Sequence, residues 1–132
     1  MVFYKPYSDN SKIAEWFPQT DFSEDAVYGA YTALESGAVA GKCLVKIVGT
    51  ACEITDLEAS SADPLLVEGL IRSALHFAAN RGAYAAVCRL HSVKDVLLLL
   101  GFREENGTFN GTIPELLAGS CCKCPPNAVD SN

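Results

Sequence analysis

Three carboxylates lie close together in the segment ACEITDLEA, which runs from residue 51 to residue 59. A carboxylate held beside a substrate can take up a proton, so this cluster could serve acid–base chemistry. Successive side chains of a strand point to opposite faces, and Glu53 therefore shares a face with Leu57. Asp56 and Glu58 point to the opposite face unless a bulge intervenes. Carboxylates on a solvated strand face are the alternative interpretation, and the sequence leaves both open.

The next segment, SSADPLLVEG over residues 60–69, changes from polar to apolar in a way that is typical of a helix start. The first turn of a helix leaves backbone N–H groups without partners, and these groups bind anions readily. Asp63 is a favoured N-cap residue, and Pro64 suits the first helical position. The segment is therefore either an anion-binding helix start or one that its own carboxylate already caps.

A third cluster lies near the C-terminus, where Cys121, Cys122 and Cys124 occur within four residues. Thiolates bind zinc, copper(I) and iron–sulfur clusters. A closed zinc site needs four ligands, usually in pairs separated by two to four residues. Three sulfurs this close depart from that spacing, and a fourth ligand would have to come from Cys88, His91 or another chain. A metal site, thiol redox chemistry or modification, and a frayed tail all stay open.

The elements that must position these residues follow from the pattern of apolar side chains. Residues 27–34, 39–48 and 51–59 have strand composition and are joined by short turns, which predicts an antiparallel meander. From Asp63 to Asn80 the apolar residues recur at helical spacing, and Gly82 follows as a terminator. Residues 83–90 are apolar on both faces, as in a buried strand parallel to the strand before the helix.

The flanking segments are shorter. Residues 9–17 predict a short helix capped by Asp9, Asn10 or Ser11. Residues 92–100, SVKDVLLLL, predict a largely buried helix that ends at Gly101. From Phe102 onward we expect one more strand, a turn at residues 106–107 and an irregular segment. The whole forms a single domain over residues 1–120, followed by a cysteine-rich, flexible tail over residues 121–132.

Composition excludes several classes of partner. The net charge of −6 and the pI of about 4.8 argue against a nucleic-acid surface, which needs a concentrated basic face. No apolar run approaches the roughly 20 residues that a membrane-spanning helix needs. The N-terminus has no secretory pattern, so we expect a cytoplasmic protein with reduced cysteines and no membrane partner.

The order of these elements resembles that of the GNAT family of acetyltransferases. The resemblance implies an α/β (α+β) fold whose mixed sheet combines an antiparallel meander with a parallel β-α-β crossover and flanking helices. The phrases that carry it are YKPYSDNSKIAEWF at residues 4–17, VAGKCLVKI at 39–47, EITDLEA at 53–59, LIRSALHFAANRGA at 70–83 and LLLLGF at 97–102. Together they span most of the chain.

The resemblance also implies a reaction, in which an acetyl group moves from acetyl-CoA to a small-molecule amine. The family's base is in some members a glutamate of the fourth strand, which corresponds here to Glu53 first and Glu58 second. Acetyl-CoA would bind along that strand and at the start of the main helix. The residues at these positions are Leu57, Ala59, Leu65, Leu66 and Val67.

The sequence departs from the family at two functional positions. The phosphate-binding pattern is Gln/Arg-x-x-Gly-x-Gly/Ala, and its fixed positions fall on Ala62, Leu65 and Val67, none of which fits. Two residues further on they fall on Pro64, Val67 and Gly69, of which only Gly69 fits. Leu97 stands at the position of the tyrosine that acts as the general acid in the family, and leucine cannot donate a proton. Cys88 and His91 are the nearby substitutes. A non-catalytic binding module on the same fold is therefore the alternative function.

The sequence shows no clear counterpart of the family's final strand. A sheet edge left open at that place could pair with another copy of the chain, so we predict that a homodimer could form.

Overall fold

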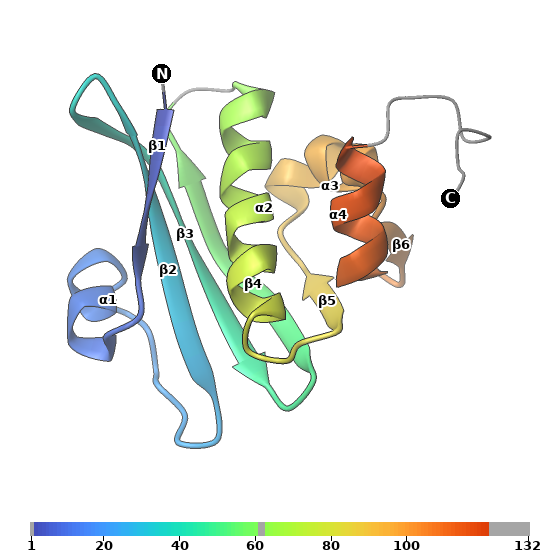
Figure 1. The fold of residues 1–132 in the computed structure, drawn as a ribbon, viewed down its shortest axis with the longest axis horizontal. Coiled ribbons are helices and arrows are strands. Elements are labelled where there is room, and N and C mark those ends of the chain that lie inside the picture. Colours follow the sequence, from blue (N-terminus) through green and yellow to red (C-terminus); the bar gives the residue numbers. More distant parts are fainter. Residues whose placement is uncertain (1, 61–62, 122–132) are drawn as a thin grey trace.

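The protein is described by a computed structural model over residues 2–60 and 63–121. One mixed sheet with helices on both faces makes up this part of the chain (Figure 1). Its strands are β1 (Val2–Tyr7), β2 (Val27–Glu35), β3 (Ala38–Val48), β4 (Ala51–Ala59), β5 (Ala85–Cys88), β6 (Arg103–Glu105) and β7 (Thr108–Thr112), in the spatial order β1-β2-β3-β4-β5-β7-β6. The helices are α1 (Asn10–Trp16), α2 (Pro64–Ala79), the 3-10 helix η1 (His91–Val93), α3 (Lys94–Leu100) and α4 (Ile113–Cys121).

The predicted meander is present, because β2, β3 and β4 pair antiparallel in sequence order. Ser36 and Gly37 make the first turn with φ of 53° and 82°, and Gly49 makes the second with φ of 60°. These left-handed conformations are easy for glycine and allow the strands to turn back tightly. Strand β1 adds to the outer edge, antiparallel to β2.

Helix α2 follows the meander and connects it to β5. Asp63 caps the helix as predicted, with its side chain accepting a hydrogen bond from the N–H of Leu65. The helix buries its apolar face against the sheet, and Leu70, Ile71 and Leu75 are fully buried there. Strand β5 then pairs parallel to β4, which confirms the predicted crossover.

Helix α1 lies on the other face of the sheet. Ile13 and Phe17 pack against Tyr28, Ala30 and Leu44 in a second cluster, separate from the core under α2. Because neighbouring β3 residues alternate between the two clusters, each face of the meander has its own apolar layer. The structure thus offers two surfaces on which a site could be built.

The C-terminal region differs from the prediction. A hairpin of β6 and β7 turns at Asn106 and Gly107, and β7 pairs with β5. The expected absence of a final strand is therefore wrong, and β7 covers the edge of β5 that was expected to stay open. Residues predicted to be irregular form β7 and α4. The homodimer stays a prediction, without that open edge to support it.

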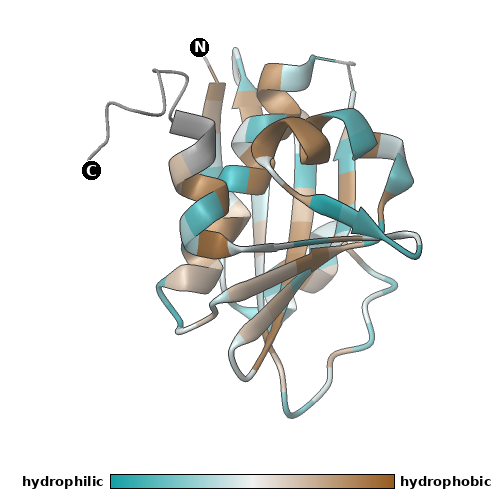
Figure 2. Ribbon diagram, turned by 90° about the vertical axis from the view of Figure 1, so that its right-hand side faces the viewer, coloured by the Kyte–Doolittle hydropathy of each residue, from teal (hydrophilic) through white to brown (hydrophobic). Residues whose placement is uncertain are grey.

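Helix α3 is less buried than expected. Val96, Leu97 and Leu100 are buried, but Leu98 and Leu99 are exposed by 43% and 61%. Figure 2 shows the apolar colour of α3 beside the hydrophilic residues of β6. In the described part of the chain, no helix is long and apolar enough to cross a membrane.

Candidate functional site

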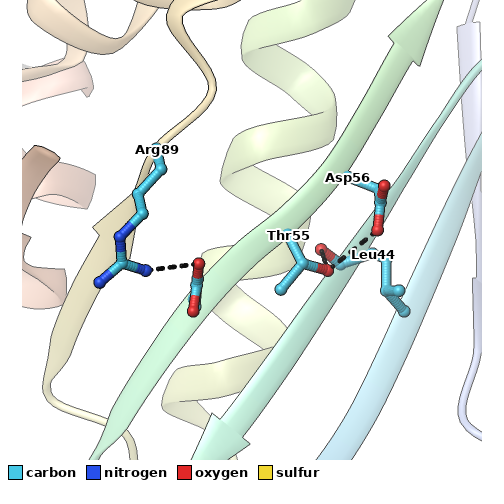
Figure 3. A network of polar contacts seen from close by, with 5 residues as sticks. Leu44, Thr55, Asp56 and Arg89 are labelled. Carbon is cyan, nitrogen blue, oxygen red and sulfur yellow. Dashed lines mark hydrogen bonds and ion pairs between the residues drawn. The ribbon is translucent and has the colours of Figure 1, made fainter. Parts of the chain in front are cut away.

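A bulge in β4 determines where the candidate carboxylates point. Leu44 of β3 pairs with Asp56, but the next β3 residue, Val45, pairs with Ile54, so Thr55 is an extra residue in β4. An extra residue reverses the alternation of the strand that follows it. Figure 3 shows Thr55 and Asp56 side by side at this point, with the Thr55 hydroxyl directed to the carbonyl of Leu44.

The bulge places the three carboxylates on one face. Before it, Cys52 and Ile54 belong to the core under α2, and after it Leu57 and Ala59 pack against that core. The cross-strand partners of the carboxylates are Lys46 for Glu53, Leu44 for Asp56 and Lys42 for Glu58. The bulge is the stated exception to the predicted separation of Glu53 from Asp56 and Glu58, so the three carboxylates share one face.

Strands β4 and β5 part after the bulge and leave a cavity of about 640 Å³, which we name the β4–α3 cleft. Their pairing ends at Ile54 and Cys88, while β4 continues to Ala59. The cleft is lined by Leu57, Glu58, Ala59, Pro64, Val67, Ser92, Val93, Asp95 and Val96. Three of the five residues predicted to bind acetyl-CoA thus line one cavity, namely Leu57, Ala59 and Val67.

A second cavity, of about 550 Å³, lies between α1 and the sheet. We name it the α1 cavity. Its lining residues are Trp16, Phe17, Pro18, Gln19, Thr20, Asp21, Tyr28, Lys42, Leu44, Lys46, Thr55, Asp56 and Glu58. The lining includes three aromatic residues and three carboxylates beside two lysines, so its charged groups leave a small negative excess that suits a ligand with an apolar body and a positive charge.

Specific hydrogen bonds hold the wall of the α1 cavity in place. The Lys42 ammonium donates to the carbonyl of Trp16 at 2.7 Å and lies 4.9 Å from the centre of the Phe17 ring. The Tyr28 hydroxyl accepts from the N–H of Ser23 at 2.9 Å, on the loop that follows α1. These contacts fix the side chains of Lys42 and Tyr28 in the wall of the cavity.

Glu58 connects the two cavities. Among the described residues it is the one that lines both the β4–α3 cleft and the α1 cavity. Its carboxylate lies 3.9 Å from the Lys42 ammonium, and its side chain is 73% exposed. Residue 58 therefore borders both cavities.

Glu53 has different surroundings. Its carboxylate accepts a hydrogen bond from the Arg89 guanidinium at 2.7 Å, across the paired part of β4 and β5 (Figure 3). It lines a small cavity of about 190 Å³, together with Lys46 and Arg89. Neither the β4–α3 cleft nor the α1 cavity is lined by Glu53.

The start of α2 does not fit the phosphates of CoA. The N–H of Leu65 donates to the Asp63 carboxylate at 3.0 Å, and those of Leu66 and Val67 donate to the Asp63 carbonyl at 3.2 Å. Leu65 is 74% exposed, Leu66 is buried in the core, and no Lys or Arg lies among the described residues of the cleft. These residues supply neither a free cradle of amides nor a positive charge.

Leu97, the residue at the position of the family's tyrosine, does not line the cleft. Leu97 is fully buried in the core. Of the proposed substitutes, Cys88 is fully buried, and burial raises the pKa of its thiol. His91 shares a hydrogen bond of 2.8 Å with the carbonyl of Gly107. The residue with a hydroxyl that does line the cleft is Ser92.

The described cysteines are core residues. Burial raises the pKa of Cys43 to about 12 and that of Cys52 to about 11, so both thiols are neutral and unreactive. Of the predicted metal ligands, Cys122 and Cys124 lie outside the described residues, as does the side chain of Cys121. Within residues 2–60 and 63–121, no group of His, Cys, Asp and Glu side chains is arranged to hold a metal.

Comparison with known proteins gives a clear result for the fold alone. No family model matches the sequence, and no curated protein matches it. Among solved structures, the ribosomal-protein-S18-alanine N-acetyltransferase of Escherichia coli superposes with a TM-score of 0.62 at 11% identity, covering 86% of this chain and 94% of that one.

Two further structures agree. The PaiA N-acetyltransferase of Thermoplasma acidophilum, solved in complex with coenzyme A, has a TM-score of 0.55 at 13% identity over 76% of this chain and 65% of that one. A tandem GNAT protein of the clavulanic acid pathway has a TM-score of 0.61 at 9% identity over 80% of this chain. The present chain spans 45% of that protein.

These similarities define the chain first as an α/β protein with the sheet of the N-acetyltransferases. The particular fold is the GNAT fold, as the order of its segments predicted.

Proposed function

We propose that this protein transfers an acyl group from a thioester to an amine, with Glu58 as the general base. The observation that carries the proposal is that Glu58 is shared by two cavities on either side of β4. A two-substrate transfer needs such a meeting point, because each substrate must approach the reacting atoms from its own side. The N-acetyltransferases with the same fold support this class of reaction.

The chemistry assigned to Glu58 is proton removal. Its carboxylate takes a proton from the ammonium of the acceptor, and the neutral nitrogen attacks the carbonyl carbon of the thioester. The C–N bond forms and the C–S bond breaks, so the products are an amide and a thiolate. The nitrogen gives up a second proton as the amide forms, the thiolate takes up that proton through water and leaves as a thiol, and Glu58 releases its own proton to solvent.

The acceptor would bind in the α1 cavity. Trp16, Phe17 and Tyr28 supply an aromatic wall, while Asp21 and Asp56 add negative charge beside Glu58. Three lining carboxylates outnumber the two lining lysines, Lys42 and Lys46, and aromatic faces and carboxylates both attract a cation. The cavity therefore favours a primary amine with an apolar or aromatic body. This assignment gives the small-molecule amine predicted from the sequence a specific place.

Glu58 is a better candidate for the base than Glu53. The Glu53 carboxylate is already engaged by Arg89 at 2.7 Å, and it borders a cavity too small for a substrate. Glu58 also faces a cation, Lys42, but at 3.9 Å, which is beyond hydrogen-bond distance. A carboxylate in a hydrogen-bonded ion pair would have to release its partner before it could accept a proton.

A non-catalytic binding module is the second candidate function. It is favoured by the helix start capped by Asp63 and by the buried Leu97 in the position of a proton donor. On this account the α1 cavity binds an amine that is never acylated. The two candidates share a ligand and differ in the product.

Mass spectrometry of reaction mixtures tests the proposal. Purified protein is incubated with acetyl-pantetheine or acetyl-CoA and a set of primary amines with aromatic, aliphatic and polar bodies. We expect an acetylated amine from at least one pair of donor and acceptor. The Glu58→Gln variant should form it at a rate at least about 100-fold lower. The matched control Glu53→Gln should react at close to the original rate.

Two outcomes would contradict the proposal. If no pair gives product above the uncatalysed rate while an amine still binds, the binding module is the better account. If Glu53→Gln loses activity and Glu58→Gln keeps it, the base is assigned to the wrong carboxylate.

A further inference from the structure

We propose that the β4–α3 cleft selects acyl donors that carry no phosphates, and that Asp63 is the residue that sets this specificity. The inference rests on the proposed function and names the class of donor: a thioester with an uncharged arm, such as pantetheine. CoA itself would be disfavoured because of its pyrophosphate and its additional phosphate.

The first argument concerns the start of α2. The Asp63 carboxylate accepts the N–H of Leu65 at 3.0 Å, so it occupies the place where an anionic ligand would bind. The favourable end of the helix dipole is thereby already satisfied by a negative charge. A phosphate brought to the same turn would meet that charge at short range and would be repelled.

The amides that remain in this turn are also committed. Pro64 begins the helix and has no N–H to offer. The N–H groups of Leu66 and Val67 lie 3.2 Å from the Asp63 carbonyl. The helix start thus differs from an anion cradle in its charge and in its donors.

The second argument comes from the cleft itself and does not depend on the helix start. Its described lining contains two carboxylates, Glu58 and Asp95, and no Lys or Arg to balance them. The neighbouring Lys94 is directed to Glu104, with 3.4 Å between ammonium and carboxylate. Lys42 lies 3.9 Å from the Glu58 carboxylate on the α1 face of β4, where it also donates to the Trp16 carbonyl at 2.7 Å, so it does not line the cleft. A ligand with several negative charges would meet Asp95 and no lining cation, and would be repelled.

The rest of the lining suits an uncharged arm. Leu57, Val67, Val93 and Val96 form apolar walls, and the Ser92 hydroxyl adds one polar group. At about 640 Å³ the cavity is within the usual size range of small-molecule sites. An extended amide-containing arm could fill it, with the thioester toward Glu58.

Calorimetric titration of two donors tests the inference. Acetyl-pantetheine and acetyl-CoA carry the same reactive arm and differ in their phosphates. We expect acetyl-pantetheine to bind at least about tenfold more tightly at low salt, and the difference to shrink as salt screens the repulsion.

Two serine variants connect the effect to Asp63. Asp63→Ser keeps a favourable N-cap but removes the charge, so the affinity for acetyl-CoA should rise about fivefold. Asp9→Ser is the matched control, because Asp9 caps α1 in the same way, accepting the N–H of Ser11 at 3.0 Å. That control should leave the affinities for both donors unchanged.

The outcomes separate this inference from the proposed function. Acetyl-CoA binding as tightly as acetyl-pantetheine, or an Asp63→Ser variant that gains no affinity for it, would overturn the inference and leave acyl transfer standing. Binding of neither thioester would overturn the inference and the proposed function together.

Discussion

The two halves of β4 contain similar residues but lie in different surroundings. Before the bulge at Thr55, the strand pairs with both β3 and β5, and Cys52 and Ile54 are buried under α2. After it, the strand keeps its pairing with β3 but parts from β5, and Leu57 and Ala59 line a cleft. One inserted residue thus separates a structural half of the strand from a half that is available to ligands.

The same division applies to the carboxylates. Glu53 belongs to the first half and is fixed by Arg89, whereas Glu58 belongs to the second and lies between two cavities. Both face away from α2, so the difference lies in their neighbours and not in their direction. Residue type alone could not have separated an ion pair from a candidate base.

Replacing one apolar residue in each half of β4 by alanine would test this division. Of the changes considered, these should alter the free energy of unfolding the most. Ile54→Ala should lower the free energy of unfolding by about 3 kcal/mol, because Ile54 is 1% exposed and would leave a cavity. Leu57→Ala, in the half-buried second half, should cost only about 1 kcal/mol. Urea denaturation measures both, and equal losses would contradict the division.

Alkaline pH should weaken the core that the two halves share. Cys52 lies in the first half, and Cys43 pairs with Leu57 of the second. Burial raises the pKa of the Cys43 thiol from 9.0 to about 12, so the unfolded chain loses its proton first. Stability is then fully present below pH 9 and falls as the pH rises toward 12, by up to about 1.4 kcal/mol per pH unit for this thiol.

Denaturation between pH 8 and about 10.5 measures this slope, with Cys43→Ala as the control. The variant should show a shallower decline. An identical decline in both proteins would show that other groups determine the alkaline limit.

Removing the ion pair of the first half should have the smallest effect. Arg89→Ala breaks a contact of 2.7 Å, but the two side chains are 60% and 34% exposed, so solvent screens them. We expect a loss of about 0.5 kcal/mol in the free energy of unfolding and no effect on acyl transfer. A large loss of activity would indicate that Glu53 and Arg89 belong to the site.

Much of the fold could be predicted from the sequence, because its signals are local. The turns at Gly37 and Gly49, the Asp63 cap and the periodicity of α2 each follow from a few neighbouring residues. The parallel pairing of β4 and β5 followed from the apolar residues 83–90, which come directly after the helix.

The parts that could not be predicted depend on contacts distant in sequence. The bulge at Thr55 is set by the register of β3, and β7 reaches its place only by pairing with β5. The exposed Leu98 and Leu99 were expected to be buried, because a run of leucines does not reveal which side faces the core. For the site, Glu58 and Glu53 could be named as alternatives, but their partners could not.

The most direct test of the central claim is a pair of NMR titrations that follow backbone amide shifts. Acetyl-pantetheine is predicted to shift the amides of the β4–α3 cleft, namely Leu57, Ala59, Val67 and Val93. Phenethylamine is predicted to shift those of the α1 cavity, namely Thr20, Leu44 and Thr55. The amide of Glu58 should move with both ligands. If Glu58 responds to neither, or if both ligands shift the same set of amides, the claim that Glu58 joins two substrate cavities is wrong.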